Sequence, residues 1–106
     1  MLCFTQETFG PVIPIMSVTS AKEAIEVANS SPFGLAGYVF GGSDAVTRSV
    51  AQQLQCGVIG VNEAAPSNAR APFGGVKYSG YGREGGAWGL MEYVTTQYLA
   101  LRSLEK

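Results

Sequence analysis

The chain has 106 residues, of which 46% are hydrophobic and 14% are charged, and its formal net charge is −1. This length fits one domain, and the charged fraction lies well below the ~25% that is typical of globular proteins. So few charges indicate a weakly polar surface that other protein normally covers. The charge balance gives no reason to expect nucleic acid or an acidic membrane as a partner. No segment reaches the ~20 apolar residues that span a membrane, and we expect a cytoplasmic protein.

The first 61 residues predict strands that alternate with helices. Apolar segments at 11–18, 35–40 and 58–61 are typical of strands, and helices are expected over 21–29 and from Asp44 to about residue 55. Ser20 and Glu23 have the spacing of a capping box, and Val46, Val50 and Leu54 are expected to face inward. This alternation predicts an α/β fold: a three-layer parallel βαβαβ unit with crossover connections.

The rest of the chain predicts a loop, a short helix and a last strand. Six of the fourteen glycines lie within residues 71–86. A helix is expected over 86–93, and residues 94–101 are β-branched and aromatic enough for a strand. We therefore divide the chain into a main part over 1–92 and a C-terminal oligomerisation strand and tail over 93–106.

The segment from Gly80 to Gly85 matches the dinucleotide-binding spacing G-x-G-x-x-G. A dinucleotide fingerprint follows the first strand of a βαβ unit of about 30 residues. Only 21 residues follow Gly85, and the preceding segment 76–79 is a poor strand. The spacing is better explained by a backbone that needs positive φ and close packing.

The residues for catalysis are scarce. The chain has no histidine, which excludes Ser-His and Cys-His pairs. Cys3 and Cys56 are better explained as small apolar residues than as nucleophiles, and the eight carboxylates form no cluster for a metal. The chain is either a binding module or a piece of something larger.

Several motifs resemble the C-terminal region of the aldehyde dehydrogenase superfamily. They are Glu7-Thr-Phe-Gly-Pro-Val12, Glu23-Ala-Ile-Glu-Val-Ala-Asn29, Phe33-Gly-Leu-Ala36, Gly57-Val-Ile-Gly-Val-Asn62 and Pro72-Phe-Gly-Gly-Val-Lys-Tyr-Ser-Gly-Tyr-Gly-Arg-Glu84. They occur in the family's order and spacing over essentially the whole chain, and the resemblance implies that residues 1–92 are part of the family's catalytic domain. Members of the family are several times longer, and their cofactor domain and nucleophilic cysteine lie upstream. Met1 then resembles an internal methionine or a late start.

The resemblance implies oxidation of a small-molecule aldehyde to an acid with NAD or NADP. Glu7 is then the carboxylate that accepts hydrogen bonds from the nicotinamide ribose, and Phe9 is the ring that packs beside the nicotinamide. Gln6 stands where the family usually has a second acid, and Gln97 where it often has lysine. The cofactor phosphates of the family bind elsewhere, so the glycine motif does not hold them.

The resemblance also implies substrate residues. Phe73 belongs to the segment that lines the family's substrate funnel, and Glu84 matches a carboxylate on the route by which protons leave the site. For Glu84 an ion pair with Arg83 or Lys77 is an equal alternative.

The loop from Asn62 to Pro72 resembles the succinate-semialdehyde branch, in which a serine at the position of Ser67 binds the substrate's distal carboxylate. For Ser67 the alternative is a serine in a polar turn. Arg70 is close enough in sequence to assist, but the branch gives it no role.

Two hypotheses follow for the chain as a whole. In the first it is the part of an aldehyde dehydrogenase near cofactor and substrate, and inactive alone. In the second it is a truncated product that acts only by assembling with itself or with a full-length relative. In either case the last strand is expected to join a neighbouring subunit and form a homo-oligomer.

Overall fold

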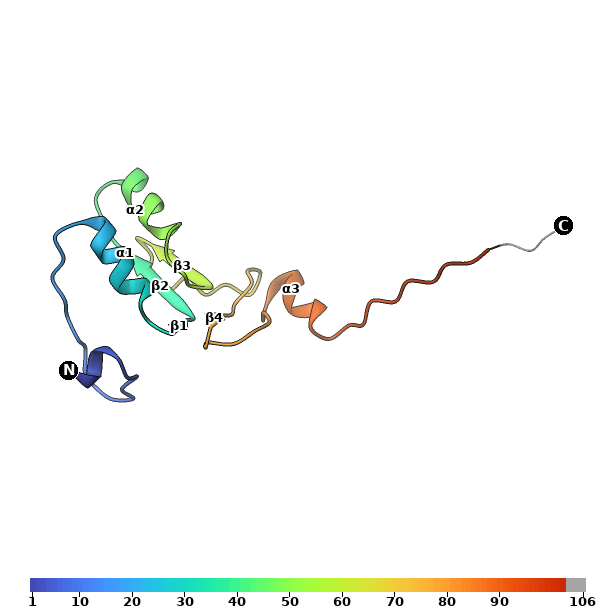
Figure 1. Cartoon of the computed structure of the whole chain (residues 1–106). Helices are drawn as coiled ribbons and strands as arrows, with labels where there is room; N and C mark the ends of the chain where they lie inside the picture. Colours follow the sequence, from blue (N-terminus) through green and yellow to red (C-terminus); the bar gives the residue numbers. More distant parts are fainter. Residues whose placement is uncertain (103–106) are drawn as a thin grey trace.

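The computed structural model describes residues 1–102, which form three helices, one 3₁₀ turn and four strands (Figure 1). In chain order these elements are η1 (Leu2–Phe4), α1 (Ala21–Asn29), β1 (Phe33–Gly34), β2 (Ala36–Val39), α2 (Asp44–Ala51), β3 (Val58–Val61), β4 (Val76–Lys77) and α3 (Gly86–Met91).

The centre of the fold is a β2–α2–β3 crossover unit. β2 and β3 pair in parallel, with Ala36 opposite Val58 and Val39 opposite Val61, and α2 packs against both strands. The Asn62 side chain fastens the ends of the strands, because its Oδ1 accepts from the Gly41 amide at 2.9 Å and its Nδ2 donates to the Gly41 carbonyl at 3.1 Å. The predicted parallel pairing and crossover are therefore confirmed for these two strands.

The predicted third parallel strand is not formed. Residues 11–18 run as irregular chain, and no described strand lies along them. A strand needs a neighbour for its backbone groups, and Pro11 and Pro14 lack amide hydrogens to donate. A second sheet that the sequence did not predict pairs β1 with β4 in antiparallel fashion, Phe33 opposite Lys77. The three-layer arrangement stays a prediction.

The starts of α1 and α2 agree with the predicted caps to within one residue, whereas α2 ends at Ala51 instead of near residue 55 and α3 ends at Met91 instead of residue 93. Ser20 Oγ accepts from the Glu23 amide at 3.1 Å, as expected, but the Glu23 carboxylate accepts from the amide of Thr19 at 2.8 Å instead of that of Ser20. The N-cap of α2 is Ser43 and not Asp44.

One residue of the predicted inward face of the second helix differs from the prediction: Val50 and Leu54 are half-buried, but Val46 is exposed. Thr47 and Ala51 are 3% and 6% exposed, whereas Val46 is 58% exposed. Val46 lines a groove that α2 forms with α1. Thr47 can be buried because its hydroxyl donates to helix carbonyls, with Ser43 O at 3.0 Å and Asp44 O at 3.1 Å.

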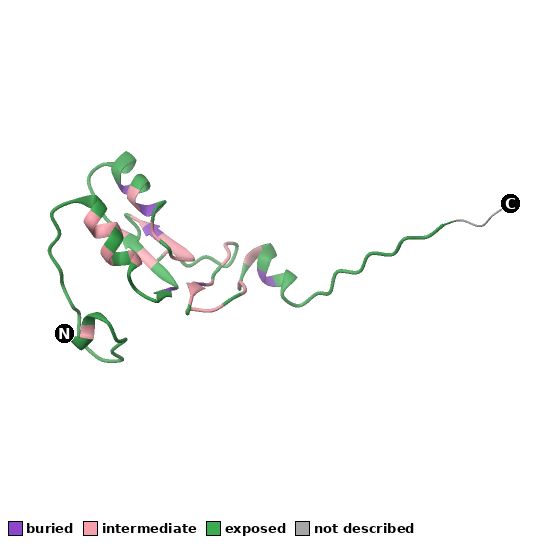
Figure 2. Ribbon diagram, in the orientation of Figure 1, coloured by how far each residue is buried: buried purple, intermediate pink, exposed green. Residues whose placement is uncertain are grey.

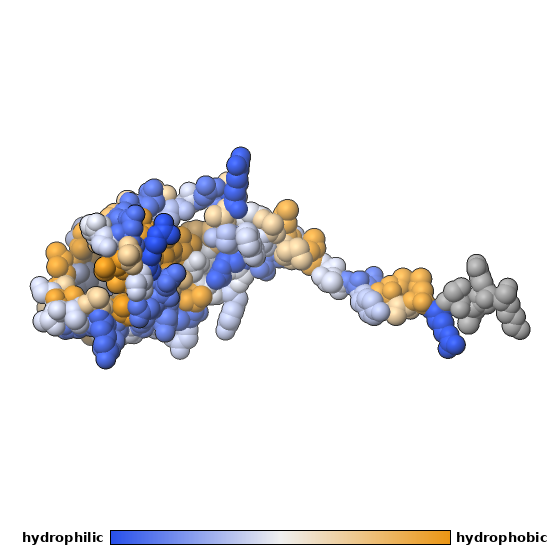
Figure 3. Space-filling model, turned by 90° about the horizontal axis from the view of Figure 1, so that it is seen from above, coloured by the Kyte–Doolittle hydropathy of each residue, from blue (hydrophilic) through white to orange (hydrophobic). Residues whose placement is uncertain are grey.

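Very few side chains are buried, as Figure 2 shows. The radius of gyration is 19.8 Å, against about 13 Å for a compact domain of 100 residues. Hydrophobic atoms are visible on the body and along the tail in Figure 3, and the exposed large side chains include Ile13, Ile15, Tyr98 and Leu99. This exposure agrees with a surface that other protein covers.

Residues 94–102 extend away from the body, and no described strand accompanies them (Figure 1). The predicted strand over 94–101 is therefore not assigned within this chain. A backbone with unpaired amides and carbonyls is what pairing with another subunit would require, and that pairing stays a prediction. The last four residues of the predicted tail lie outside the described residues.

Candidate functional site

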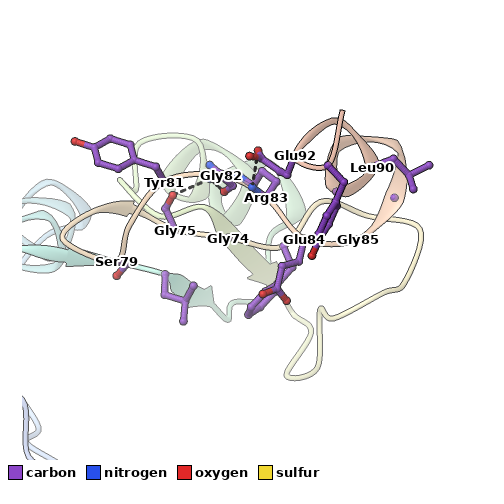
Figure 4. Close-up of a pocket in the computed structure, with 15 residues that line it drawn as sticks. Gly74, Gly75, Ser79, Tyr81, Gly82, Arg83, Glu84, Gly85, Leu90 and Glu92 are labelled. Carbon is purple, nitrogen blue, oxygen red and sulfur yellow. Dashed lines mark hydrogen bonds between the residues drawn. The ribbon is translucent and has the colours of Figure 1, made fainter. Parts of the chain in front are cut away.

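The structure brings Phe73 and Glu84 together. Their backbones form a reciprocal bridge, in which the Phe73 amide donates to Glu84 O at 2.8 Å and the Glu84 amide donates to Phe73 O at 2.7 Å. Such a pair places both side chains on the same side of the backbone. Both residues border a cleft of about 620 Å³ between the glycine-rich turn and α3 (Figure 4). Two residues predicted separately from sequence thus share one cleft.

The glycine-rich turn has the backbone that the sequence predicted. Gly80, Gly82 and Gly85 of the G-x-G-x-x-G match all have positive φ, at 101°, 81° and 71°, and Gly86 follows at 54°. The turn lies between β4, which pairs in antiparallel fashion, and the six-residue α3. A dinucleotide fingerprint instead follows the first strand of a parallel βαβ unit, which the antiparallel β4 does not form. The conformational explanation of the motif is confirmed.

Arg83 closes the turn through backbone groups. Its Nη1 donates to the carbonyls of Gly75 at 2.8 Å and Gly82 at 2.7 Å, and its amide donates to the Glu92 carboxylate at 3.2 Å (Figure 4). Within residues 1–102 the Glu84 carboxylate forms no ion pair, so the alternative of a pair with Arg83 or Lys77 is wrong for this part of the chain. The Glu84 side chain is exposed at the border of the cleft.

Ser67 lies in the exposed loop between β3 and Phe73. The side-chain bond that holds this turn comes from its neighbour, because Asn68 Oδ1 accepts from the Arg70 amide at 2.9 Å. The loop is tied to the start of α3 by the Gly86 amide, which donates to Ala69 O at 3.0 Å. Among the described residues the Ser67 hydroxyl has no hydrogen-bond partner. It therefore remains available to a ligand.

Glu7 and Phe9 follow η1 in the N-terminal segment. Glu7 borders a second cleft of about 530 Å³, together with residues of β1 and β2 and with Cys56. Leu35 and Ser79 border both clefts, so the Glu7 cleft adjoins the one between Phe73 and Glu84. The Phe9 ring is 95% exposed and contacts neither cleft within the described part. The exposed Glu7 carboxylate can accept hydrogen bonds from two hydroxyls, as the ribose role that the family resemblance implies would require.

Metal and membrane sites are not found in the described part. No group of three potential ligands occurs among residues 1–102, and none of the described helices has the length and apolarity to cross a bilayer. Cys3 and Cys56 are half-buried free thiols.

Sequence reasoning missed the residues that attach the glycine-rich turn to the rest of the fold. Lys77 has a φ of 56° and donates through Nζ to Asn29 O at 2.8 Å and Ser31 O at 3.0 Å. Ser79 Oγ accepts from the Gly34 amide at 3.0 Å. A lysine and a serine between glycines were the available signal, since side chains at such positions have a backbone cost.

Comparisons with known proteins agree with this architecture. Residues 1–99 match the model of the aldehyde dehydrogenase family. A mitochondrial succinate-semialdehyde dehydrogenase from Rattus norvegicus is 46% identical over 104 residues, which are 98% of this chain and 20% of the relative. The chain thus spans about a fifth of the length of the curated relative.

Solved structures give the same result. A succinate-semialdehyde dehydrogenase from Burkholderia pseudomallei superposes with a TM-score of 0.85 at 43% identity, over 91% of this chain and 20% of that one. An NAD⁺ complex of an aldehyde dehydrogenase from Bacillus cereus superposes with a TM-score of 0.80 at 42% identity, over 84% of this chain and 18% of that one. The family model covers far more than half of the sequence, and the chain belongs to the aldehyde dehydrogenase family.

Proposed function

We propose that these residues form the C-terminal portion of an NAD(P)-dependent aldehyde dehydrogenase that oxidises succinate semialdehyde to its carboxylic acid. The observation that carries the proposal is the similarity to a succinate-semialdehyde dehydrogenase over 98% of the chain. The similarity to an enzyme solved with NAD⁺ supports a nicotinamide cofactor. When bound, that cofactor supplies the hydride acceptor.

The residues of this chain have supporting roles in that reaction. Glu7 accepts hydrogen bonds from the nicotinamide ribose, and Phe9 restrains the nicotinamide ring. Ser67 donates to the distal carboxylate of the substrate, and the Phe73 ring borders the substrate. The free, exposed carboxylate of Glu84 passes protons between the site and solvent.

We expect the isolated 106-residue chain not to oxidise aldehydes, because the family's nucleophilic cysteine and cofactor domain lie upstream of the segment that this chain resembles. A second candidate is a non-catalytic product that acts only by assembly with itself or with a full-length relative. The exposed apolar side chains of the N-terminal segment and the tail support assembly of some kind. The intact mass of the natural polypeptide separates the two candidates, since the second requires a short product.

Ser67→Ala in the full-length enzyme tests the substrate. We expect kcat/KM for succinate semialdehyde to fall. The fall should correspond to a loss of about 1–3 kcal/mol in transition-state stabilisation, the value of a hydrogen bond to a charged group. A neutral aldehyde of similar length should be spared. Ser17→Ala is the matched control, since Ser17 is exposed and lies in the irregular segment away from both clefts. Equal losses on both substrates would show that Ser67 only supports its loop.

A further inference from the structure

Lys77 occupies a backbone conformation that few lysines adopt. Its φ of 56° lies in the left-handed region, where residues with a Cβ are strained. The same turn has glycine at Gly80 and Gly82, which also have positive φ. Glycine would adopt this φ without strain, so the presence of lysine at this position indicates that its side chain is needed.

The Lys77 ammonium caps the end of α1. It donates to the carbonyl of Asn29, the last residue of that helix, and to the carbonyl of Ser31 just beyond it. Carbonyls at a helix C-terminus lack partners within the helix and carry partial negative charge, so a cation stabilises them. The contact at Asn29 O is partly buried, where a charge-assisted bond is less weakened by water.

Asn29 extends this contact to a third segment. Its Nδ2 donates to Gln53 O at 2.8 Å, and its Oδ1 accepts from the Gln55 amide at 2.8 Å. One residue thus joins the end of α1, the chain that follows α2, and Lys77. Asn29, whose carbonyl accepts from Lys77, is therefore itself bonded to the β2–α2–β3 unit.

Lys77 lies within the loop that the Phe73–Glu84 pair closes. Two other hydrogen bonds attach the segment around Lys77 to the chain that follows α1. The Tyr78 amide donates to Pro32 O at 3.0 Å, and the Gly34 amide donates to Ser79 Oγ at 3.0 Å. Of the side chains between Phe73 and Glu84, Lys77 is the one that reaches back to α1.

We propose that Lys77 is a positioning residue: its ammonium holds the 73–84 loop against the C-terminal end of α1, so that Phe73 and Glu84 keep their places at the cleft. The kinetic part of the test rests on the proposed function. The structural part does not, because it measures the loop itself.

Lys77→Met in the full-length enzyme removes the donor and keeps the aliphatic stem. The amides of Phe73 and Glu84, which bond to each other, should then exchange hydrogen roughly tenfold faster or more, while amides of α2 are unchanged. Lys77→Arg should restore most of the protection, since it retains the cation. Lys22→Met is the control, because Lys22 is exposed and its contact to Glu26 is a 3.9 Å ion pair on the surface.

The kinetic readout separates positioning from simple support. We expect kcat with succinate semialdehyde to fall roughly 10- to 100-fold in Lys77→Met, with the KM for the dinucleotide unchanged and partial recovery in Lys77→Arg. Unchanged exchange in a folded Lys77→Met protein would overturn the proposal. Faster exchange with unchanged kcat would overturn it too, because Lys77 would then be a structural clamp.

A second variant covers failure of Lys77→Met to fold. Lys77→Gln removes the charge and keeps one donor group, so its Phe73 and Glu84 amides should exchange faster than those of the wild type and its kcat should be lower. Wild-type values in Lys77→Gln would refute the role of the ammonium. If the wild-type enzyme oxidises no aldehyde, the proposed function fails, while amide exchange still decides whether Lys77 holds the loop.

Discussion

Gly57 is the point at which the crossover unit meets the glycine-rich turn, and Gly57→Ala should disturb both. Its amide donates to Gly34 O at 3.0 Å. A Cβ at this position would collide with the carbonyl oxygen of Gly74 and would lie 2.8 Å from its carbonyl carbon and 3.0 Å from Gly75 Cα. All of these atoms are backbone, so no side chain can turn aside to make room.

The expected loss in the free energy of unfolding depends on whether side chains or backbone must move to make room for the new Cβ. Overpacking by an added carbon costs about 1–3 kcal/mol when side chains can shift. Because backbone must move here, we expect a loss of about 3 kcal/mol in the free energy of unfolding, at the upper end of that range. Gly74 follows Phe73 directly, so kcat/KM should fall as well.

Gly42→Ala is the matched control. A Cβ at Gly42 meets no heavy atom within 4 Å, and the substitution should change stability by less than about 0.5 kcal/mol. The assay is denaturant unfolding of the two full-length variants at equal protein concentration, together with kcat/KM. Equal midpoints for Gly57→Ala and Gly42→Ala would refute the inference that the turn is packed against Gly57.

Three further predictions concern the N-terminal carboxylate, the tail and the cap of α1. Glu7→Gln in the full-length enzyme should slow hydride transfer by raising its activation free energy by about 1–3 kcal/mol, because a charged acceptor for the ribose is lost. An unchanged single-turnover rate would show that Glu7 is not part of the site. Deletion of residues 94–106 should change the oligomer, because the apolar tail would no longer pair with a neighbour; light scattering that gives the same mass before and after would contradict this. Hydrogen bonds from the Thr19 amide and then its hydroxyl lower the pKa of Glu23, so the stabilisation is present at neutral pH and is lost as the pH falls through the lowered pKa. The melting temperatures of the wild type and Glu23→Gln should therefore converge between about pH 5 and pH 2, and a constant difference would count against the cap.

The sequence predicted the elements whose signals are local. The cap at Ser20, the parallel pairing of β2 with β3 and the positive φ values of the glycine-rich turn depend on residues close in sequence or on a repeated pattern. Val46 was wrongly predicted to face inward because hydrophobicity alone favours it over Thr47, whereas the Thr47 hydroxyl donates to the Ser43 carbonyl and the residue is buried.

The rest depended on partners that sequence patterns do not identify. β1 and β4 have two residues each, too few for any periodicity, and they pair across more than forty positions. Residues 11–18 and 94–101 have the composition of strands but no partner among residues 1–102. At the site, Phe73 and Glu84 were predicted individually from the family resemblance. Their backbone pairing and the hydrogen bonds from Lys77 to the end of α1 emerged only from the structure.

The order in which contacts become possible follows from the pairing of Phe33 with Lys77. The β2–α2–β3 unit is complete once Val61 has been synthesised, whereas β1 must wait for Lys77, sixteen residues later. At about 5–20 residues per second, this delay is on the order of one to three seconds. A local parallel crossover thus exists before the loop that bears Phe73 and Glu84 joins it. The mostly exposed loop over 63–70 thus follows a crossover unit whose strands have already been synthesised, so changes in this loop carry less risk to folding than changes at Asn62 or Gly74.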